Sequence, residues 1–514
     1  MPTYDLTEKL TSYGSFKITA QSTATGYEDS DVVGLTYSIG PKIALKKGII
    51  TITSLIQGVT SFDIYANETK IGNVAYDYSS DWSIAIEDYM ASLDDGKYTV
   101  SLCAVGEGIS DNRSNSVTVY KGGSPIYGVS WVNDTTTTMT RTDDATEMTY
   151  AIQSSDGSIA SDFNDAFPWN ETAILTLDAG QFLKFPDMYF RVGVDDNGDI
   201  NSVAVSASPS SDGDWYEVKS FYYGIYGASM SGSALQSVTG VARKNNITRA
   251  AFRTAAQAAG DGYFQLDLYH KTVLTFLWWI EWATKNSESI MVGKTSATGS
   301  SAVNTGGTDN VSTPSGFNTS TKQMRYHYIE DFIGNYWEFI DGVSGNTSNK
   351  IWVCADPAKY TDTVGDSNYS QTSYTIQTSN GFPLGFGWDA NNPFMVYGTR
   401  TGGSGSTAFC DYTWVMTSSY PVVYSGAAWD YSGSNCGLCY FGDSSVGAAN
   451  GNLGARLLKR QLEKYHWSVT SSASWRKRTP NRVRSSRAFG SRKTVRGRKE
   501  TSAMARCLRQ SILF

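Results

Sequence analysis

The sequence predicts a β-rich chain in which an all-β N-terminal part precedes an α+β domain and a basic tail. Three observations support this order. The 514 residues include 49 Gly, 32 Tyr and 14 Trp among long Ser/Thr/Asn stretches, a composition typical of strands joined by many loops. Only two segments have apolar residues at helical spacing, and both lie between residues 248 and 284. Residues 461–514 contain 14 Lys/Arg against two acidic residues. At roughly 150 residues per domain, this length predicts about three domains.

The first 121 residues alternate apolar and polar positions between turn residues, as antiparallel strands do. Ser61–Asn67 and Thr69–Val74 form the clearest expected hairpin. A pattern of strand, turn, alternating strand and polar turn occurs twice, and it resembles the immunoglobulin-like or fibronectin-like sandwich modules that act as spacers. The resemblance implies a partial module over residues 1–45 and an immunoglobulin-like β-sandwich over residues 46–121, followed by a linker at Lys121–Pro125.

A β-rich stretch over residues 126–230 leads into the α+β domain, which we expect over residues 231–460. Thr248 can cap a helix over Arg249–Ala259, where alanines dominate. A second helix is expected over about Phe264–Thr284, with apolar residues at helical spacing and tryptophans on a second face. This second helix should therefore be almost entirely buried.

Charge and apolar runs limit the cellular setting. The N-terminal residues show no basic segment followed by an apolar core, so no export signal is expected. The longest apolar run, Val273–Ile280, ends at Glu281 and is too short to span a bilayer, which predicts no membrane insertion. Six scattered cysteines do not predict a disulfide framework. The tail carries +12 and the rest of the chain −19. We expect the tail, residues 461–514, to be disordered without a specific role. Outside this basic tail, we do not expect nucleic acid to be a partner.

Residues 425–460 combine a regular frame of glycine, tryptophan and apolar residues with chemically unrelated side chains between them. Such a frame specifies a backbone, and the residues between its members can differ without unfolding it. The frame consists of Gly426, Trp429, Gly433, Ser434, Asn435, Gly437, Leu438, Asn452, Leu453, Gly454, Ala455, Arg456, Leu457 and Leu458.

Together with the two helices and the segment Gly334–Glu338, this frame resembles the C-type-lectin-fold tail proteins of bacteriophages, close to the formylglycine-generating-enzyme branch of that fold. Residues 390–458 are similar to the variable region of proteins diversified by retroelements. The resemblance covers residues 126–460 and departs from the family at Ala427, where a second glycine is usual, and near Ser432, where one residue is inserted. The scaffold that it implies consists of Gly426, Trp429, Gly437, Leu438, Gly454, Ala455, Arg456, Leu457, Asn335, Trp337 and Glu338.

The resemblance implies a receptor-binding protein of a phage tail, located in the virion and made in the host cytoplasm. Its partners would be a bacterial surface protein or glycan and other tail proteins, and we expect a homotrimer. Aromatic side chains at Tyr431, Tyr440 and Phe441 would supply contact area. The ligand-binding residues that it implies are Ala428, Asp430, Tyr431, Ser432, Cys436, Cys439, Tyr440, Phe441, Asp443 and Val446.

Two cysteines in this region, Cys436 and Cys439, raise the alternative of catalysis. A zinc site needs four convergent ligands, and no second close Cys or His pair exists. The related oxidases use a copper-binding cysteine pair that is spaced more widely than Cys436 and Cys439, which argues against copper coordination here. A divergent cysteine oxidase is the alternative function, and a surface adhesin without diversification is a third. We expect no enzyme activity, catalytic residue, metal or cofactor. Glu338 is expected to accept backbone hydrogen bonds in the core, and His270 to be a hydrogen-bonded core residue or a helix-packing residue.

Overall fold

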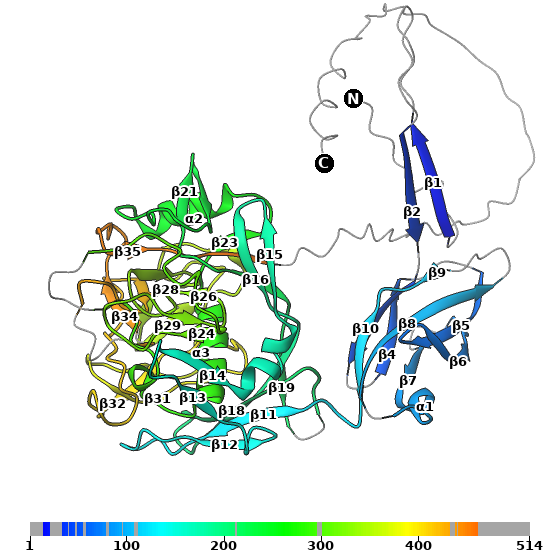
Figure 1. Ribbon diagram of the computed structural model, residues 1–514, viewed down its shortest axis with the longest axis horizontal. Coiled ribbons are helices and arrows are strands. Elements are labelled where there is room, and N and C mark those ends of the chain that lie inside the picture. The colour runs from blue at the N-terminus through cyan, green and yellow to red at the C-terminus, as the bar shows by residue number, and fades with distance from the viewer. Residues whose placement is uncertain are drawn as a thin grey trace, which may run out of the picture. The chain divides into compact units, whose positions relative to one another are not determined.

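The computed structural model describes residues 14–20, 33–39, 41–46, 49–54, 58–78, 82–94, 96–106, 112–210, 213–295, 301–431, 437–438 and 440–460. The chain divides near Val119 into two compact units, next to the expected linker. Strands predominate over helices in both units, which confirms the predicted β-rich character (Figure 1). Within these ranges, no helix combines the length and apolar character needed to cross a membrane.

The N-terminal unit contains two sheets that share one core. One sheet has the order β3-β4-β7, and the other has the order β10-β8-β5-β6, with β9 also paired to β8. Buried side chains from both sheets, including Ile50, Phe62, Ile84 and Leu102, form one apolar cluster. The expected hairpin is confirmed as β5 paired antiparallel with β6. The elements are β3 (Lys42–Lys46), β4 (Ile49–Ser54), β5 (Val59–Ala66), β6 (Thr69–Ala75), β7 (Ser83–Ala85), α1 (Glu87–Met90), β8 (Gly96–Gly106), β9 (Asn112–Arg113) and β10 (Val117–Lys121).

The chain before residue 40 has a simpler structure. Strands β1 (Gly14–Ala20) and β2 (Val33–Ile39) form an antiparallel ladder of their own. The next strand, β3, belongs to the sandwich sheet even though it lies almost wholly within the expected partial module of residues 1–45. Among the described residues, that module therefore contributes one two-stranded ladder and one strand of the following sandwich.

The second unit contains three five-stranded sheets within its described residues. The first has the order β12 (Thr140–Asp143), β11 (Ile126–Ser130), β18 (Ile200–Ser206), β17 (Met188–Val194) and β19 (Trp215–Val218). The second has the order β13 (Tyr150–Ile152), β14 (Ser158–Ser161), β24 (Ser315–Gly316), β25 (Arg325–Tyr326) and β26 (Ile329–Glu330). The third has the order β15 (Ala173–Leu177), β16 (Gly180–Lys184), β20 (Phe221–Gly224), β36 (Leu457–Arg460) and β23 (Tyr263–Gln265).

Smaller sheets complete the unit. One has the order β34 (Tyr440–Ser444), β33 (Val422–Ser425), β27 (Trp337–Ile340) and β35 (Leu453–Gly454). Others are β28 (Val343–Thr347), β29 (Lys350–Val353) and β30 (Ser370–Gln371); β21 (Ser229–Ser231) and β22 (Ala234–Gln236); and β31 (Pro383–Phe386) and β32 (Gly398–Thr401). Short 3-10 turns are η1 (Asp162–Asp165), η2 (Trp169–Glu171), η3 (Ser287–Ser289) and η4 (Pro357–Lys359).

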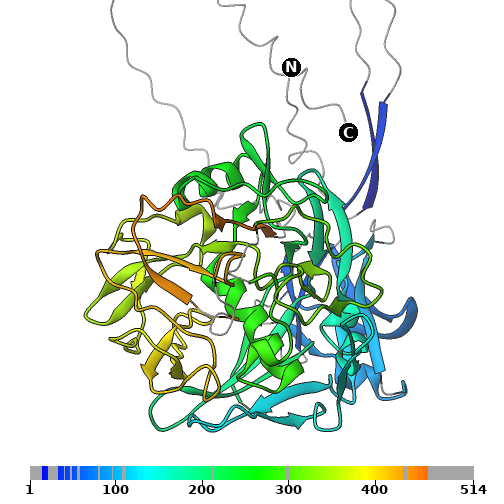
Figure 2. The ribbon, with the colours of Figure 1, turned by 60° about the vertical axis from the view of Figure 1, so that its left-hand side comes forward.

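Both helices expected in this unit are present. Helix α2 spans Arg249–Gln257, and the Thr248 side chain accepts a hydrogen bond from the Ala251 amide, as predicted for its cap. Helix α3 spans Leu268–Trp282, later than expected, because Tyr263–Gln265 pairs as strand β23 and Asp267 caps the helix. Thirteen of its fifteen residues are buried, which confirms the expected burial. Figures 1 and 2 both show α3 in the interior of the unit.

Residues 126–230 and residues 231–460 form one unit. Strand β36, from the end of the described chain, lies between β20 and β23. Strand β14 likewise pairs with β24. The two segments distinguished at residue 230 therefore share sheets, and the last described strand completes a sheet that begins near residue 173.

Candidate functional site

The frame residues that are far apart in the sequence meet at strand β27. The Gly334 amide donates to the Gly426 carbonyl at 2.7 Å, and the Trp429 amide donates to the Asn335 carbonyl at 3.1 Å. Asn335 has φ 65°, a left-handed conformation that asparagine tolerates better than most residues. These contacts join the segment Gly334–Glu338 to the start of the C-terminal segment, residues 425–460.

The other end of the C-terminal segment runs parallel to β27. Trp337 lies opposite Leu453 and Glu338 opposite Gly454 in the β27–β35 ladder. On its other side, β27 pairs antiparallel with β33, which immediately precedes the segment. Both ends of the segment are therefore attached to the same strand.

Arg456 fastens the frame through a fully buried guanidinium. Its Nε donates to Glu338 Oε2 at 3.1 Å. Its two terminal nitrogens donate to four backbone carbonyls at 2.7–3.1 Å, which belong to Gly224, Ile225, Glu330 and Asp331. One side chain thus ties together strands β20, β26, β27 and the loop that ends the segment.

Glu338 lies between two arginines. Its Oε1 is 2.7 Å from Arg243 Nη2 and 2.8 Å from Arg456 Nη2. Burial alone would raise the pKa of this carboxyl, but the two guanidinium groups hold the pKa below its usual value. The expectation that Glu338 accepts backbone hydrogen bonds was wrong, because its carboxylate faces two buried cations that need an anionic partner.

A second carboxyl next to this cluster has the opposite shift. Asp331 Oδ2 accepts from the Asn335 and Gln323 side-chain amides, both at 2.8 Å. Complete burial and the nearby Glu330 raise the pKa of Asp331 to about 7. The scaffold beneath the segment thus contains one carboxylate whose pKa is lowered, Glu338, and one carboxyl whose pKa is raised to about 7, Asp331.

The side chains expected to contact a ligand have unequal exposure. Asp430 is exposed, Val446 is 47% exposed, and Tyr431, Phe441 and Asp443 are half-buried. Ser432, Cys436 and Cys439 lie outside the described residues.

Ala428 and Tyr440 are buried, at 0% and 3% exposure, so the expectation that they lie on the surface was wrong. Ala428 belongs to an apolar core cluster. Tyr440 is stacked against Tyr397, with ring centroids 5.5 Å apart. Alternation along an edge strand turns Tyr440 inward and Phe441 outward.

The half-buried aromatic residues of the segment join a larger cluster. The Phe441 ring stacks on Tyr424 at 4.6 Å and lies 4.4 Å from Trp414, centroid to centroid. Trp414 also meets Tyr431 edge-on at 5.7 Å. Sequence reasoning missed Trp414, although Tyr412–Met416 alternates as a strand would. The Trp414 amide donates to the Tyr440 carbonyl at 2.9 Å, which places Trp414 beside the segment.

Polar groups border this aromatic cluster. Asp430 accepts from the Asn452 side-chain amide, with both oxygens 3.2 Å from Nδ2. Asp443 Oδ1 is buried, and no described residue donates to it. Partial burial raises the pKa of Asp443. The aromatic surface and these carboxylates can together contact a ligand that offers both an apolar face and hydrogen-bond donors.

The remaining chemical candidates are structural. In the described part of the chain, no group of three or more His, Cys, Asp or Glu side chains is placed to hold a metal ion. His270 Nδ1 is 2.8 Å from Asp267 Oδ1 at the start of α3, and its half-buried ring packs against Phe221 and Phe264, so the structure supports the helix-packing alternative and not the core one. Cys103, Cys354 and Cys410 are buried thiols, and burial raises the pKa of Cys410 to about 12. An open cleft of about 290 Å³ between β13, β14 and η1 contains none of the expected site residues.

The chain matches no model of a known protein family. No curated protein matches it either.

Proposed function

We propose that this chain is the receptor-binding protein of a bacteriophage tail, with a C-type-lectin-like domain that presents residues 428–446 to a bacterial surface. In this proposal the N-terminal sandwich is an immunoglobulin-like spacer, and the binding domain begins after it. We expect homotrimers and contacts with other tail proteins, as the resemblance of the sequence to such proteins implies.

One observation carries the proposal: most described frame residues are buried and hydrogen-bonded, whereas five of the described residues between them are exposed or half-buried, namely Asp430, Tyr431, Phe441, Asp443 and Val446. Arg456 and Asn335 are completely buried and make hydrogen bonds that fix both ends of the segment. Asp430 and Val446 point outward instead, where substitutions usually change stability by less than about 0.5 kcal/mol. A surface on which side chains can differ while the backbone stays the same suits recognition of changing receptors.

The aromatic cluster supports recognition of a ligand rather than catalysis. Tyrosine and tryptophan supply large contact areas at low entropic cost, and they are common in binding surfaces. Tyr431, Phe441 and Trp414 together form such a surface, bordered by the carboxylate of Asp430. Several copies per virion would raise a modest affinity by multivalency.

A cell-binding experiment tests the proposal. Fluorescently labelled full-length protein is incubated with the bacterial strains on which the phage grows, and bound fluorescence is measured by flow cytometry. We expect the variant Tyr431→Ala/Val446→Ser to lose binding at least tenfold. The matched control Val132→Ser/Ile174→Ser changes apolar residues that are 68% and 51% exposed elsewhere in the same unit and should bind as the wild type does. Equal binding by both variants, or no binding by the wild type, would contradict the proposal.

Diversification has a separate test. Sibling phage genomes should differ in the codons of Asp430, Tyr431 and Val446 while they retain those of Gly454 and Arg456. A reverse transcriptase gene and a near-copy of codons 425–458 should lie nearby. Identical codons across siblings, without such genes, would remove diversification and leave the adhesin alternative.

A further inference from the structure

The middle of the proposed binding segment, residues 428–446, is held by two residues that are far away in the sequence. Ser287, in turn η3, donates through its hydroxyl to Asp411 Oδ1 at 2.6 Å. The carboxyl of Asp411 also accepts a hydrogen bond from the Leu438 amide. Ser287, Asp411 and Leu438 are 1%, 6% and 5% exposed, so this contact lies inside the protein.

Gly437 makes this approach possible. A Cβ atom at Gly437 would lie 1.7 Å from Ser287 Oγ and 2.0 Å from Asp411 Oδ1, closer than any side chain can be placed. The backbone of the segment therefore contacts the Ser287–Asp411 pair directly, and only glycine leaves enough space for it.

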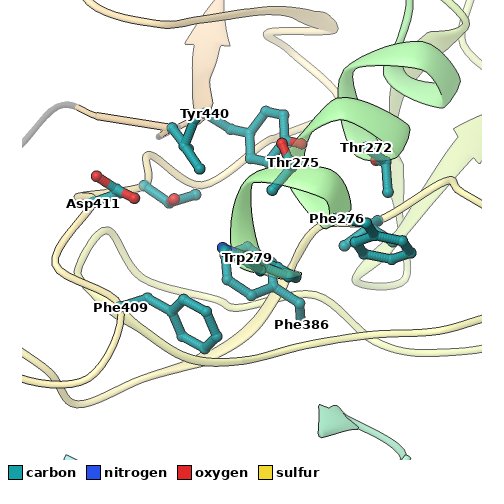
Figure 3. Close-up of a pocket in the computed structure, with 11 residues that line it drawn as sticks. Thr272, Thr275, Phe276, Trp279, Phe386, Phe409, Asp411 and Tyr440 are labelled. Atoms are coloured by element: carbon teal, nitrogen blue, oxygen red, sulfur yellow. The ribbon is translucent and has the colours of Figure 1, made fainter. Parts of the chain in front are cut away.

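Leu438 and Asp411 also line a small cavity beside helix α3. The cavity holds about one water molecule, and α3 contributes Thr272, Thr275, Phe276 and Trp279 to its wall. Figure 3 shows Asp411, Phe409 and Tyr440 around this part of the helix. Asp411 and Leu438 thus face the same cavity as helix α3, of which 13 of 15 residues are buried.

We propose that Asp411, held by Ser287, is a positioning residue of the binding segment, because it fixes Leu438 and with it the end of the stretch that begins at Trp429. The beginning of that stretch is fixed by the bond between the Trp429 amide and the Asn335 carbonyl. This inference rests on the proposed function, in which the segment contacts the ligand.

The physical effect of the anchor is preorganisation. Residues whose backbone is already fixed in the free protein, such as Trp429 and Leu438, lose less conformational entropy on binding, so more of the contact energy appears as affinity. The acceptor is a carboxyl whose burial raises its pKa to about 6, while the Ser287 hydroxyl, the Leu438 amide and the positive charge of Lys271 lower it. Above pH 7 the carboxylate prevails, and hydrogen bonds to a carboxylate are stronger than neutral ones.

Hydrogen exchange tests the anchor without a ligand. Full-length protein at pH 7.5 is studied by exchange mass spectrometry with fragmentation that resolves the Leu438 amide. We expect Asp411→Ala to accelerate exchange at Leu438 about ten- to hundredfold, the range for loss of a hydrogen bond to a charged group. The matched control is Asp389→Ala, which removes a carboxylate that is 3% exposed and accepts the Ser373 and Asn391 amides.

Asp389→Ala should accelerate exchange at Ser373 and Asn391 and leave Leu438 unchanged. Gly437→Ala should release Leu438 with Asp411 still present, and Ser287→Ala should cause a smaller acceleration, so the inference remains testable if Asp411→Ala does not fold. Unchanged exchange at Leu438 in Asp411→Ala, or equal acceleration in Asp389→Ala, would overturn the anchor. Neither result involves receptor binding, so the cell-binding test of the proposed function would stand independently.

Discussion

Replacement of Arg456 by alanine should be among the most destabilising single substitutions in the second unit. The side chain makes five hydrogen bonds, one to Glu338 and four to backbone carbonyls, and none of these groups is exposed to water. Removal of one partner from a buried ion pair costs about 3–5 kcal/mol. Arg243 still neutralises Glu338, which limits the charge penalty, but the four carbonyls lose their donors. We therefore expect a loss of about 4 kcal/mol in the free energy of unfolding.

Thermal unfolding of the second unit, followed by tryptophan fluorescence, measures this effect. With an unfolding entropy of about 2.1 cal/mol/K per residue, a loss of about 4 kcal/mol in a unit that spans Tyr120–Lys464 should lower Tm by about 6 °C. Arg456→Lys keeps the charge but offers three donors for five bonds, so its loss should be intermediate. Arg400→Ala is the matched control, because Arg400 is 37% exposed and pairs with Asp199 outside the frame. Its change in Tm should be much smaller.

A double-mutant cycle separates the ion pair from the carbonyl contacts. If Glu338 is coupled to Arg456, the variant Arg456→Ala/Glu338→Gln should be more stable than the sum of the single changes predicts, because the amide removes the charge that Arg456 compensated. Additive losses would refute the coupling between the two residues. If Arg456→Ala lowers the free energy of unfolding by less than about 1 kcal/mol, Arg456 does not hold the frame together.

Three further predictions follow from single contacts. Because the folded pKa of Asp331, about 7, exceeds its usual value, its contribution to stability is complete below about pH 4 and is lost as the pH rises through 7; Asp331→Asn should reduce the fall of Tm between pH 5 and 8, and an unchanged slope would contradict this. Thr248→Ala should cost about 1 kcal/mol in chemical unfolding because it removes the α2 cap, whereas no loss would show that the cap is dispensable. Asp443→Asn should leave Tm at pH 7 unchanged or higher, since no described donor supports the buried Oδ1; a lower Tm would reveal a missed partner.

Local features of the fold could be predicted from the sequence, and non-local pairings could not. The start of α2 follows from Thr248 alone, because a cap acts within one turn. The start of α3 was placed too early, because Tyr263–Gln265 is apolar enough to continue the helical pattern yet pairs with β36 nearly 200 residues later. The insertion of β36 between two earlier strands leaves no local signal.

The candidate site shows the same limit at the level of single side chains. The resemblance named Asn335, Trp337 and Glu338 as scaffold residues without saying what they contact; the structure shows that Asn335, Trp337 and Glu338 bond or pair with the C-terminal segment. It did not predict that Tyr440 faces inward, because strand register decides which of two neighbouring residues is buried, and register depends on the partner strand.

Burial also indicates which residues of the segment can differ most freely. Asp430 and Val446 are exposed, so their replacement mainly changes the surface, although replacement of Asp430 also removes its hydrogen bonds from Asn452. Phe441 is half-buried between Tyr424 and Trp414, and a smaller side chain there would leave a gap between two rings. Tyr440 belongs to the main core cluster and lines the cavity next to Asp411. Variation at the segment is therefore graded by depth: contacts made by the exposed residues can change independently of stability, whereas a change at Tyr440 would alter the support on which all of them rest.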